Sequence, residues 1–399
     1  MDENKGEISE ELTANGEKSG VQAENADDSF QEPFNPREIS ITSKVISLDA
    51  VIRRIRSATI HLAPNFQRKA VWDEKRKSLL IESLMLNIPI AIFYVADDGK
   101  GNWEVVDGLQ RLTAIQEFVI DKTLKLTGLE FWKDYQGKTI DDLPPIPYNQ
   151  IMETQFNFVI IEPGTHEAVK YNIFKRINTG GMPLSGQEIR HALYQGKGTD
   201  LLAELAQTEN FLLATDRSVK DSRMAARELI LRFLSFLILG TDGYINNDNM
   251  EDFLRKGLQI LNHLDDLQNK KLIKEYSADL LKKVRIKDYQ LIRNIFDLGM
   301  LRNYEIFGNN AFRISLQNHS PRSPINKGLF ETWGCSLAEL SGNDYQKLTK
   351  KKDILLSAYE QKKRDDFFYR SVSRDAWKKP NVDSRFQTIS DIIRSTINA

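Results

Sequence analysis

The stretch WEVVDGLQRLTAI, residues 103–115, decides how this chain folds. Residues 103–106 are predicted to form a short strand. After it, Leu112, Ile115, Val119 and Ile120 recur at helical spacing. Residues 107–111 are therefore predicted to lie at a turn from a strand into a helix.

The sequence on either side of this turn predicts short strands mixed with helices. Residues 90–95 are apolar and β-prone, and residues 97–102 carry dense turn chemistry, so residues 90–106 are expected to form a hairpin. Asp73 is expected to cap a helix that runs to residue 87. Residues 155–161 alternate like a further strand, and residues 168–177 and 185–194 show helical patterns.

Strand signals largely disappear after residue 199. Helices are expected at residues 225–239, 250–264, 276–284, 289–300, 345–363 and 386–397. The predicted fold class is therefore α+β, with a small mixed sheet in a lobe at residues 35–198 and an α-helical lobe at residues 199–399.

Residues 1–34 differ from the rest of the 399-residue chain in charge. They hold ten acidic residues and two lysines, a net charge of −8, so the whole-chain charge of −1 leaves about +7 for the remainder. Because this segment has almost no large apolar side chains before Phe30, it is predicted to be a disordered acidic tail.

Composition also limits the compartment and the class of protein. The single cysteine, Cys335, excludes an intramolecular disulfide framework and is expected to be buried. The first residues lack the pattern of a signal peptide. Residues 229–239 are apolar but about half the length that crosses a bilayer, and they include Arg232. We expect a cytoplasmic protein without a membrane partner, and we interpret residues 229–239 as a buried helix.

The strand-to-helix turn is the best candidate site, because the open N–H groups and positive end of a helix attract anions. Gly108 permits close approach of the backbone, Arg111 offers a planar charged fork for phosphate oxygens, and Asp107 is the candidate ligand for a divalent cation, Mg²⁺. Gln110 would orient a phosphate or a water molecule. The alternative is that Asp107 caps the helix and Gln110 completes a capping box.

Two further loops are weaker candidates for anion binding. Gln67 and Arg68 lie in a short basic loop, whose alternative role is to anchor neighbouring aromatic residues. The second loop contains Arg176, Asn178, Thr179 and Gly180, whose alternative role is to end a helix and form a turn.

Several enzyme templates are missing from the sequence. It has no phosphate loop ending in Gly-Lys-Ser/Thr, no His-Glu-x-x-His helix and no Gly-x-Ser-x-Gly elbow. The five histidines are scattered singly, so their spacing does not indicate a metal cluster.

Four segments, taken in order, resemble one known family. They are residues 66–72, 81–89, 106–113 and 174–181. Together they resemble the N-terminal domain of GmrSD-type modification-dependent restriction enzymes, which implies a ParB/sulfiredoxin-like fold for the first lobe. Residues 326–331 and 382–393 also resemble the helical half of stand-alone members of that family.

The resemblance implies a function. In that family an Asp-Gly-Gln-Gln-Arg-type motif is tied to binding and hydrolysis of nucleoside triphosphates, in systems that defend bacteria against foreign DNA. Asp107, Gly108, Gln110 and Arg111 match the motif, and Leu109 replaces its first Gln. Asp107, Gln110 and Arg111 are thus the expected catalytic residues. The absence of a His-Asn-His nuclease signature implies that a separate nuclease subunit would cut the DNA.

Two other functions stay open from the sequence alone. One is a DNA-binding or scaffold module that uses the basic runs at residues 282–285 and 350–352 without hydrolysis. The other is a metal-dependent nickase that uses Asp107. The sequence indicates neither the preferred nucleotide nor the oligomeric state.

Overall fold

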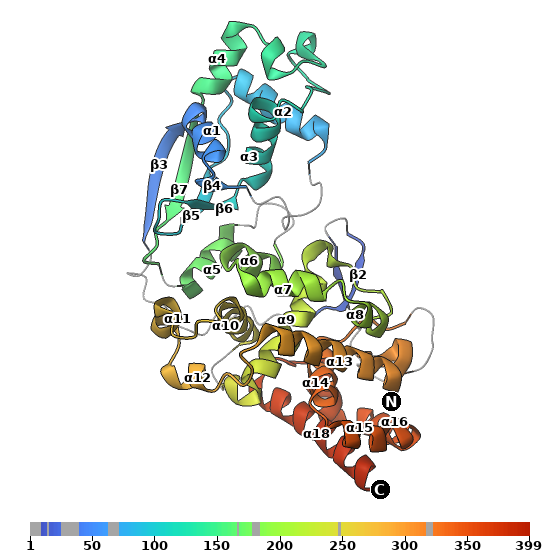
Figure 1. Ribbon diagram of the computed structural model, residues 1–399. Coiled ribbons are helices and arrows are strands. Elements are labelled where there is room, and N and C mark those ends of the chain that lie inside the picture. The colour runs from blue at the N-terminus through green and yellow to red at the C-terminus, as the bar shows by residue number, and fades with distance from the viewer. Residues whose placement is uncertain are drawn as a thin grey trace. The chain divides into compact units, whose positions relative to one another are not determined.

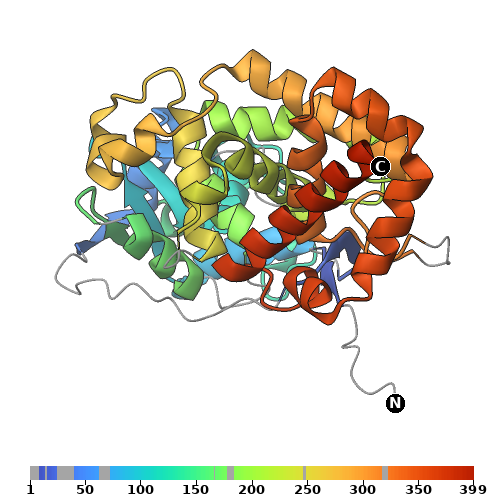
Figure 2. The same cartoon turned by 90° about the horizontal axis from the view of Figure 1, so that it is seen from below.

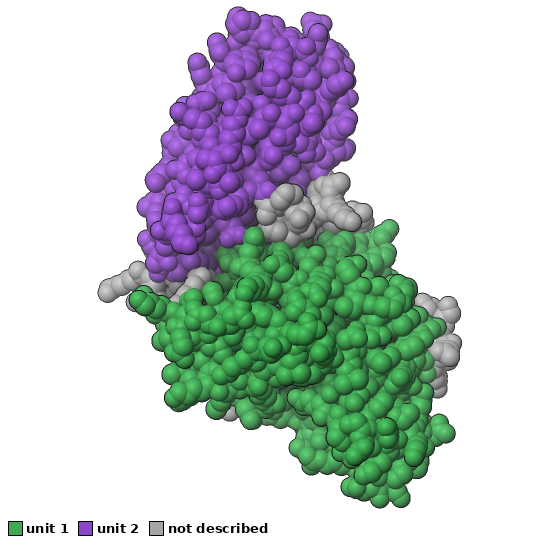
Figure 3. All heavy atoms as spheres, viewed as in Figure 1, with its two compact units in different colours: residues 1–31, 185–399 green, residues 32–184 purple. Residues whose placement is uncertain are grey.

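A computed structural model describes residues 9–13, 16–24, 40–62, 72–165, 167–177, 184–245, 249–316 and 322–399 (Figure 1). The chain divides into two compact units (Figure 3). Unit 1 contains residues 1–31 and 185–399, and unit 2 contains residues 32–184. The second unit is thus inserted between two pieces of the first.

Unit 2 is built on a five-stranded mixed sheet in the order β3-β7-β5-β6-β4. The strands β3 and β7, and β5 and β6, pair antiparallel, whereas β5 and β7, and β4 and β6, pair parallel. Their bounds are β3 Ile41–Ser47, β4 Ile60–His61, β5 Phe93–Asp97, β6 Trp103–Asp107 and β7 Gln155–Ile161. The predicted small mixed sheet and the hairpin of β5 and β6 are confirmed.

Helices cover this sheet, and their ends follow local capping chemistry. The side chain of Asp73 accepts a hydrogen bond of 2.7 Å from the backbone N–H of Arg76, which confirms the predicted start of α2. Inside, the rings of Phe93 and Phe158 stack with centroids 5.0 Å apart. The helices are α1 Leu48–Arg56, α2 Glu74–Met85, α3 Leu109–Ile115, α4 Pro145–Glu153 and α5 Glu167–Ile177.

Unit 1 is helical, as predicted for the second half of the chain (Figure 2). The apolar stretch near residue 230 forms α9, in which Leu229–Leu239 are all buried, and Cys335 is buried too. The helices are α6 Gly186–Leu193, α7 Lys197–Leu205, α8 Glu209–Ala214, α9 Ala225–Leu239, α10 Met250–Asn262, α11 Lys270–Glu275, α12 Ala278–Lys282, α13 Tyr289–Phe307, α14 Lys327–Ala338, α15 Gly342–Lys350, α16 Lys352–Lys363, α17 Asp366–Ser373 and α18 Lys379–Asn398.

The acidic N-terminal segment differs from the prediction. Within residues 1–34, the strands β1 (Glu10–Leu12) and β2 (Lys18–Gln22) form an antiparallel hairpin. Val21 is fully buried in the core of unit 1, and the N–H of Gln22 donates to the carbonyl of Ile325 at 2.8 Å. The prediction of disorder is wrong for these strands, because buried partners far along the chain compensate for their acidic side chains.

Two other boundaries also differ. The structure divides the chain after residue 184, whereas the sequence placed the boundary after residue 198, because α6 packs with the helices of unit 1. The helix expected at residues 345–363 is two helices, α15 and α16, which meet at Lys351 with a φ of −111°. Among the described residues, no helix combines the length and apolar character needed to cross a membrane.

Candidate functional site

The turn at residues 107–109 is opened by a glycine in the left-handed region. Asp107 ends β6, Gly108 has φ +101°, and Leu109 begins α3. L side chains rarely adopt this φ. A Cβ atom at residue 108 would also lie 2.4 Å from Cδ1 of Phe93, a distance shorter than any real contact. Backbone conformation and packing therefore both require glycine here.

The first turn of α3 carries no side-chain cap. Gly108 is the N-cap residue and makes no capping hydrogen bond. The alternative in which Asp107 caps the helix and Gln110 completes a capping box is therefore wrong, because Asp107 is still part of β6. The N–H groups of the first helical turn point out of the helix start without an intrahelical acceptor.

Arg111 is held by its own surroundings. Its Nη2 donates to Oδ2 of Asp107 at 2.7 Å and to the carbonyl of Ile92 at 3.1 Å, and its Nη1 donates to the carbonyl of Ala91. The guanidinium carbon also lies 4.4 Å from the centroid of the Phe93 ring. Only 12% of this side chain is exposed. The sequence predicts a phosphate clamp, but these contacts engage several of its donors.

The charges at the turn balance each other. Burial lowers the pKa of the Arg111 guanidinium from its usual value, and the ion pair with Asp107 raises it in opposition. Arginine remains charged across the physiological range. The Asp107 side chain is 39% exposed, so it is the accessible member of the pair. The partly buried ion pair therefore presents a carboxylate oxygen to solvent and keeps the cation behind it.

The residues at the turn fit a divalent cation only with help from a ligand. Among the residues that the structure describes, no three His, Cys, Asp or Glu side chains lie together as a metal site. Mg²⁺ is commonly held by one or two carboxylates together with substrate phosphates and water. A single accessible carboxylate at Asp107 is consistent with that mode of binding, and not with a site built from protein ligands alone.

The two weaker loops are only partly described. Gln67, Arg68, Asn178, Thr179 and Gly180 lie outside the described residues. Arg176 is exposed near the C-terminal end of α5, where the helix dipole stabilises a positive charge. Gln110 is half-buried in the first turn of α3, three residues after Asp107. Of the predicted set, the structure therefore places Asp107, Gly108 and Arg111 against one another, and Gln110 lies on the same turn of chain.

The support of the turn was missed by sequence reasoning. The segment before β5 supplies the carbonyls of Ala91 and Ile92, and Phe93 supplies the ring beneath Gly108 and Arg111. Backbone carbonyls carry no sequence signal, so only the tertiary structure identifies them. The β5 hairpin thus positions the turn as well as completing the sheet.

A carboxylate elsewhere in unit 2 was also missed. Glu82 on α2 is 3% exposed, and it accepts hydrogen bonds from the backbone N–H groups of Glu130, Phe131 and Trp132 at 3.0, 2.8 and 2.8 Å. Burial would raise the pKa of Glu82, but these bonds outweigh it, and the pKa lies below its usual value. The carboxylate therefore fixes a loop in which Phe131 is 70% exposed.

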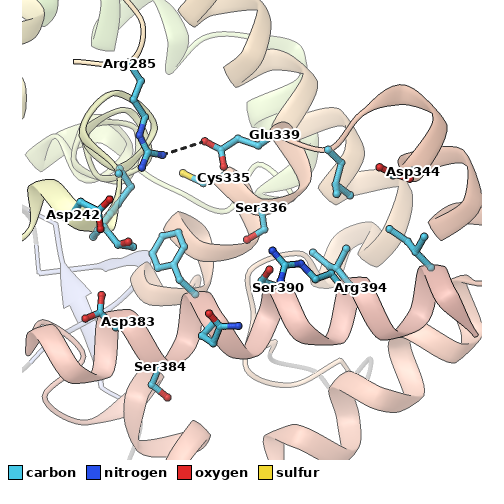
Figure 4. A pocket seen from close by; sticks show the side chains of 18 of the residues that line it. Asp242, Arg285, Cys335, Ser336, Glu339, Asp344, Asp383, Ser384, Ser390 and Arg394 are labelled. Atoms are coloured by element: carbon cyan, nitrogen blue, oxygen red, sulfur yellow. Dashed lines mark ion pairs between the residues drawn. The ribbon is translucent and has the colours of Figure 1, made fainter. Parts of the chain in front are cut away.

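Unit 1 contains a groove that is also a candidate binding site (Figure 4). It encloses about 1020 Å³ and is lined by residues of α14, α18 and the loop after α9. Arg285 and Glu339 form an ion pair of 3.9 Å across it. The lining charges are Arg285, Lys379, Arg394, Asp242, Glu339, Asp344 and Asp383. Because acidic residues outnumber basic ones, the groove does not suit a polyanion.

The fold and the turn define unit 2 as a small mixed-sheet α+β domain with a glycine-opened strand-to-helix turn. Residues 50–195 match the family model of the GmrSD restriction endonuclease, N-terminal domain. The resemblance carried by the four segments is thereby confirmed for this part of the chain. No curated protein and no solved structure matches the chain. The ParB/sulfiredoxin-like character of the fold stays a prediction.

Proposed function

We propose that unit 2 binds the phosphate groups of a nucleoside triphosphate at residues 107–111, and that the protein acts in the restriction of foreign or modified DNA. The family match supports the second part, because the matched domain belongs to restriction endonucleases. The uncapped first turn of α3 supports phosphate binding at residues 107–111, since the backbone amides at the start of a helix bind anions.

Each residue of the turn has a distinct role in this proposal. Gly108 lets the chain turn from β6 into α3 at φ +101°, so that the amides of residues 109–111 open the helix at this point. Gln110 orients a phosphate oxygen or a water molecule. Arg111 acts mainly as a positioning residue, because its contacts with Asp107, Ala91 and Ile92 hold the turn in place.

Asp107 would hold Mg²⁺ together with the triphosphate. The cation would neutralise phosphate charge and would make attack on the terminal phosphorus easier. The contribution of the chain is to fix this carboxylate through the 2.7 Å bond from Arg111. Hydrolysis is the further step of the proposal, and it requires a separate test from binding.

Calorimetric titration with ATP, in the presence and absence of Mg²⁺, tests the binding step. We expect Arg111→Gln to weaken binding about tenfold, because Asp107 loses its orientation and the turn loses one charge. The matched control is Arg53→Gln, which breaks an ion pair with Asp49 at the same spacing in the same unit, at 3.1 Å and largely exposed. Equal affinity for ATP in wild type and Arg111→Gln would defeat the assignment.

A further inference from the structure

A buried ionic cluster lies in unit 1, among the helices α6, α9, α14 and α18. The cluster contains Arg190 of α6, Glu228 and Arg232 of α9, Lys327 and Glu331 of α14, and Arg385 of α18. Glu331 has no exposed side-chain surface, and Arg385 is 1% exposed. Cations this deeply buried are stable only when carboxylates or other anions neutralise them.

The acidic hairpin, residues 9–24 with β1 and β2, supplies two of these carboxylates. Glu11 accepts a hydrogen bond of 2.6 Å from Nζ of Lys327, and Glu24 pairs with the guanidinium of Arg232. The side chains of Lys327 and Arg232 are only 6% and 4% exposed. A segment at the far N-terminus of the chain thus neutralises cations that the helices themselves leave in excess.

Within the helices, three cations lie close to the single carboxylate of Glu228. Glu228 lies 2.7 Å from Lys327, 3.3 Å from Arg232 and 3.6 Å from Arg190. Without Glu11 and Glu24, four cations would face Glu228, Glu251 and Glu331, an excess of one positive charge. With the hairpin in place five carboxylates face four cations, so the hairpin reverses the sign of the cluster.

The outer strand of the hairpin, β1, contacts the ionic cluster through Glu11. Among the described residues, β1 pairs with β2 in a two-stranded sheet, and Leu12 is 50% exposed. Burial and the neighbouring Glu228 and Glu24 raise the pKa of Glu11, while Lys327 lowers it in opposition. The ionised form of Glu11 is therefore poorly stabilised, and a stronger anion would compete with it for Lys327.

We propose that Arg232 and Lys327, with Arg190 behind them, form a phosphate-binding site that Glu11 and Glu24 occupy as internal ligands. A phosphate monoester or pyrophosphate carries about two negative charges or more, and two neighbouring phosphodiesters of a nucleic acid carry two together. Either can replace two carboxylates on a guanidinium and an ammonium group. The phosphate comes from a nucleic-acid backbone or from a free nucleotide or pyrophosphate. This site lies in unit 1 and is independent of the turn at Asp107.

The test removes the negative charges of Glu11 and Glu24 and keeps the size of their side chains. The double variant Glu11→Gln/Glu24→Gln is titrated with pyrophosphate and, separately, with a short duplex DNA. We expect at least one probe to bind about tenfold more tightly than to wild type, and the probe that gains identifies the source of the phosphate. Glu17→Gln is the matched control, because Glu17 lies on the same hairpin but pairs at 2.7 Å with Lys220, an exposed residue outside the cluster.

Unchanged binding of both probes in a double variant that keeps the wild-type circular dichroism would overturn the proposal. The cluster would then be a structural ion network. If the double variant does not fold, hydrogen exchange on the wild-type chain decides instead. Saturating pyrophosphate or the duplex DNA must then increase exchange in β1, the strand that carries Glu11, and no increase with either probe would overturn the proposal. Adding Asp107→Asn to each protein leaves these results unchanged, which separates them from the nucleotide site.

Discussion

Phe93 lies directly against Gly108, so that a Cβ atom at residue 108 would be 2.4 Å from Cδ1 of the ring. Gly108→Ala therefore combines strain at φ +101° with a steric overlap. We expect a loss of about 2–4 kcal/mol in the free energy of unfolding, measured by urea denaturation.

Gly101→Ala is the matched control for this substitution. Gly101 has φ +87°, but a Cβ atom there would meet nothing within 4 Å. This variant should lose only the conformational part, about 1 kcal/mol. Equal losses in the two variants would show that the Phe93 contact adds nothing and that strain alone requires glycine at residue 108.

Removal of the Asp107 carboxylate should abolish the dependence on metal. We expect Asp107→Asn to keep its fold and to lose any increase in nucleotide affinity that Mg²⁺ gives the wild type, because an amide is a far weaker ligand for Mg²⁺. Phosphate release from each of the four ribonucleoside triphosphates, with and without modified DNA, measures hydrolysis in the same pair of proteins. Release that persists undiminished in Asp107→Asn would exclude this carboxylate from the reaction.

Glu82→Gln should destabilise unit 2 although it changes only one atom. The carboxylate accepts hydrogen bonds from the backbone N–H groups of residues 130–132. An amide would place an NH₂ group opposite at least one of these N–H groups, so that two donors would face each other. We expect a loss of about 1–3 kcal/mol in the free energy of unfolding. The exposed Glu130 gives the control Glu130→Gln, which should leave stability unchanged. If Glu82→Gln were as stable as the wild type, the three hydrogen bonds to the carboxylate would contribute nothing to the stability of unit 2.

His191 should make the protein less stable in mild acid. Burial, with a further contribution from Arg227, lowers the pKa of His191 to about 4, below its usual 6.5. Between these values the unfolded chain binds a proton that the folded protein does not, so stability falls as the pH decreases through this window. From pH 7 to pH 5 the loss is about 2 kcal/mol.

Denaturation of wild type and His191→Gln at the two pH values measures this effect. The variant should lose about 2 kcal/mol less than wild type on acidification. His61→Gln changes an exposed histidine in unit 2 and should follow the wild type. If His191→Gln loses as much stability as wild type, this histidine is not the acid-sensitive group.

Local pattern was sufficient for much of the fold. The strand at β6, the glycine turn and the cap at Asp73 were predicted because each depends on residues close in sequence. The break at Lys351 was missed because both flanking segments keep helix-forming residues, and nothing in the local sequence marks Lys351, whose φ is −111°, as the point where the helix ends. The hairpin was missed because its stability comes from Lys327 and Ile325, about 300 residues away.

The candidate site was predictable in composition but not in arrangement. Sequence reasoning selected Asp107 and Arg111, and the structure places them 2.7 Å apart. It did not anticipate that Arg111 would donate to the carbonyls of Ala91 and Ile92, because such acceptors are the same for every residue type. The role of an arginine thus depends on its neighbours in space.

The insertion of unit 2 into unit 1 imposes an order on biosynthesis. Glu11 leaves the ribosome 316 residues before its partner Lys327. At typical rates of translation this interval is roughly 15–60 s. Unit 2 has its whole chain during that time and folds first, while the nascent N-terminal strands wait unpaired with their helices. Unit 1 is therefore assembled last, and a truncated product that ends just before α14 lacks Lys327, the partner of Glu11, although it keeps Arg232, the partner of Glu24.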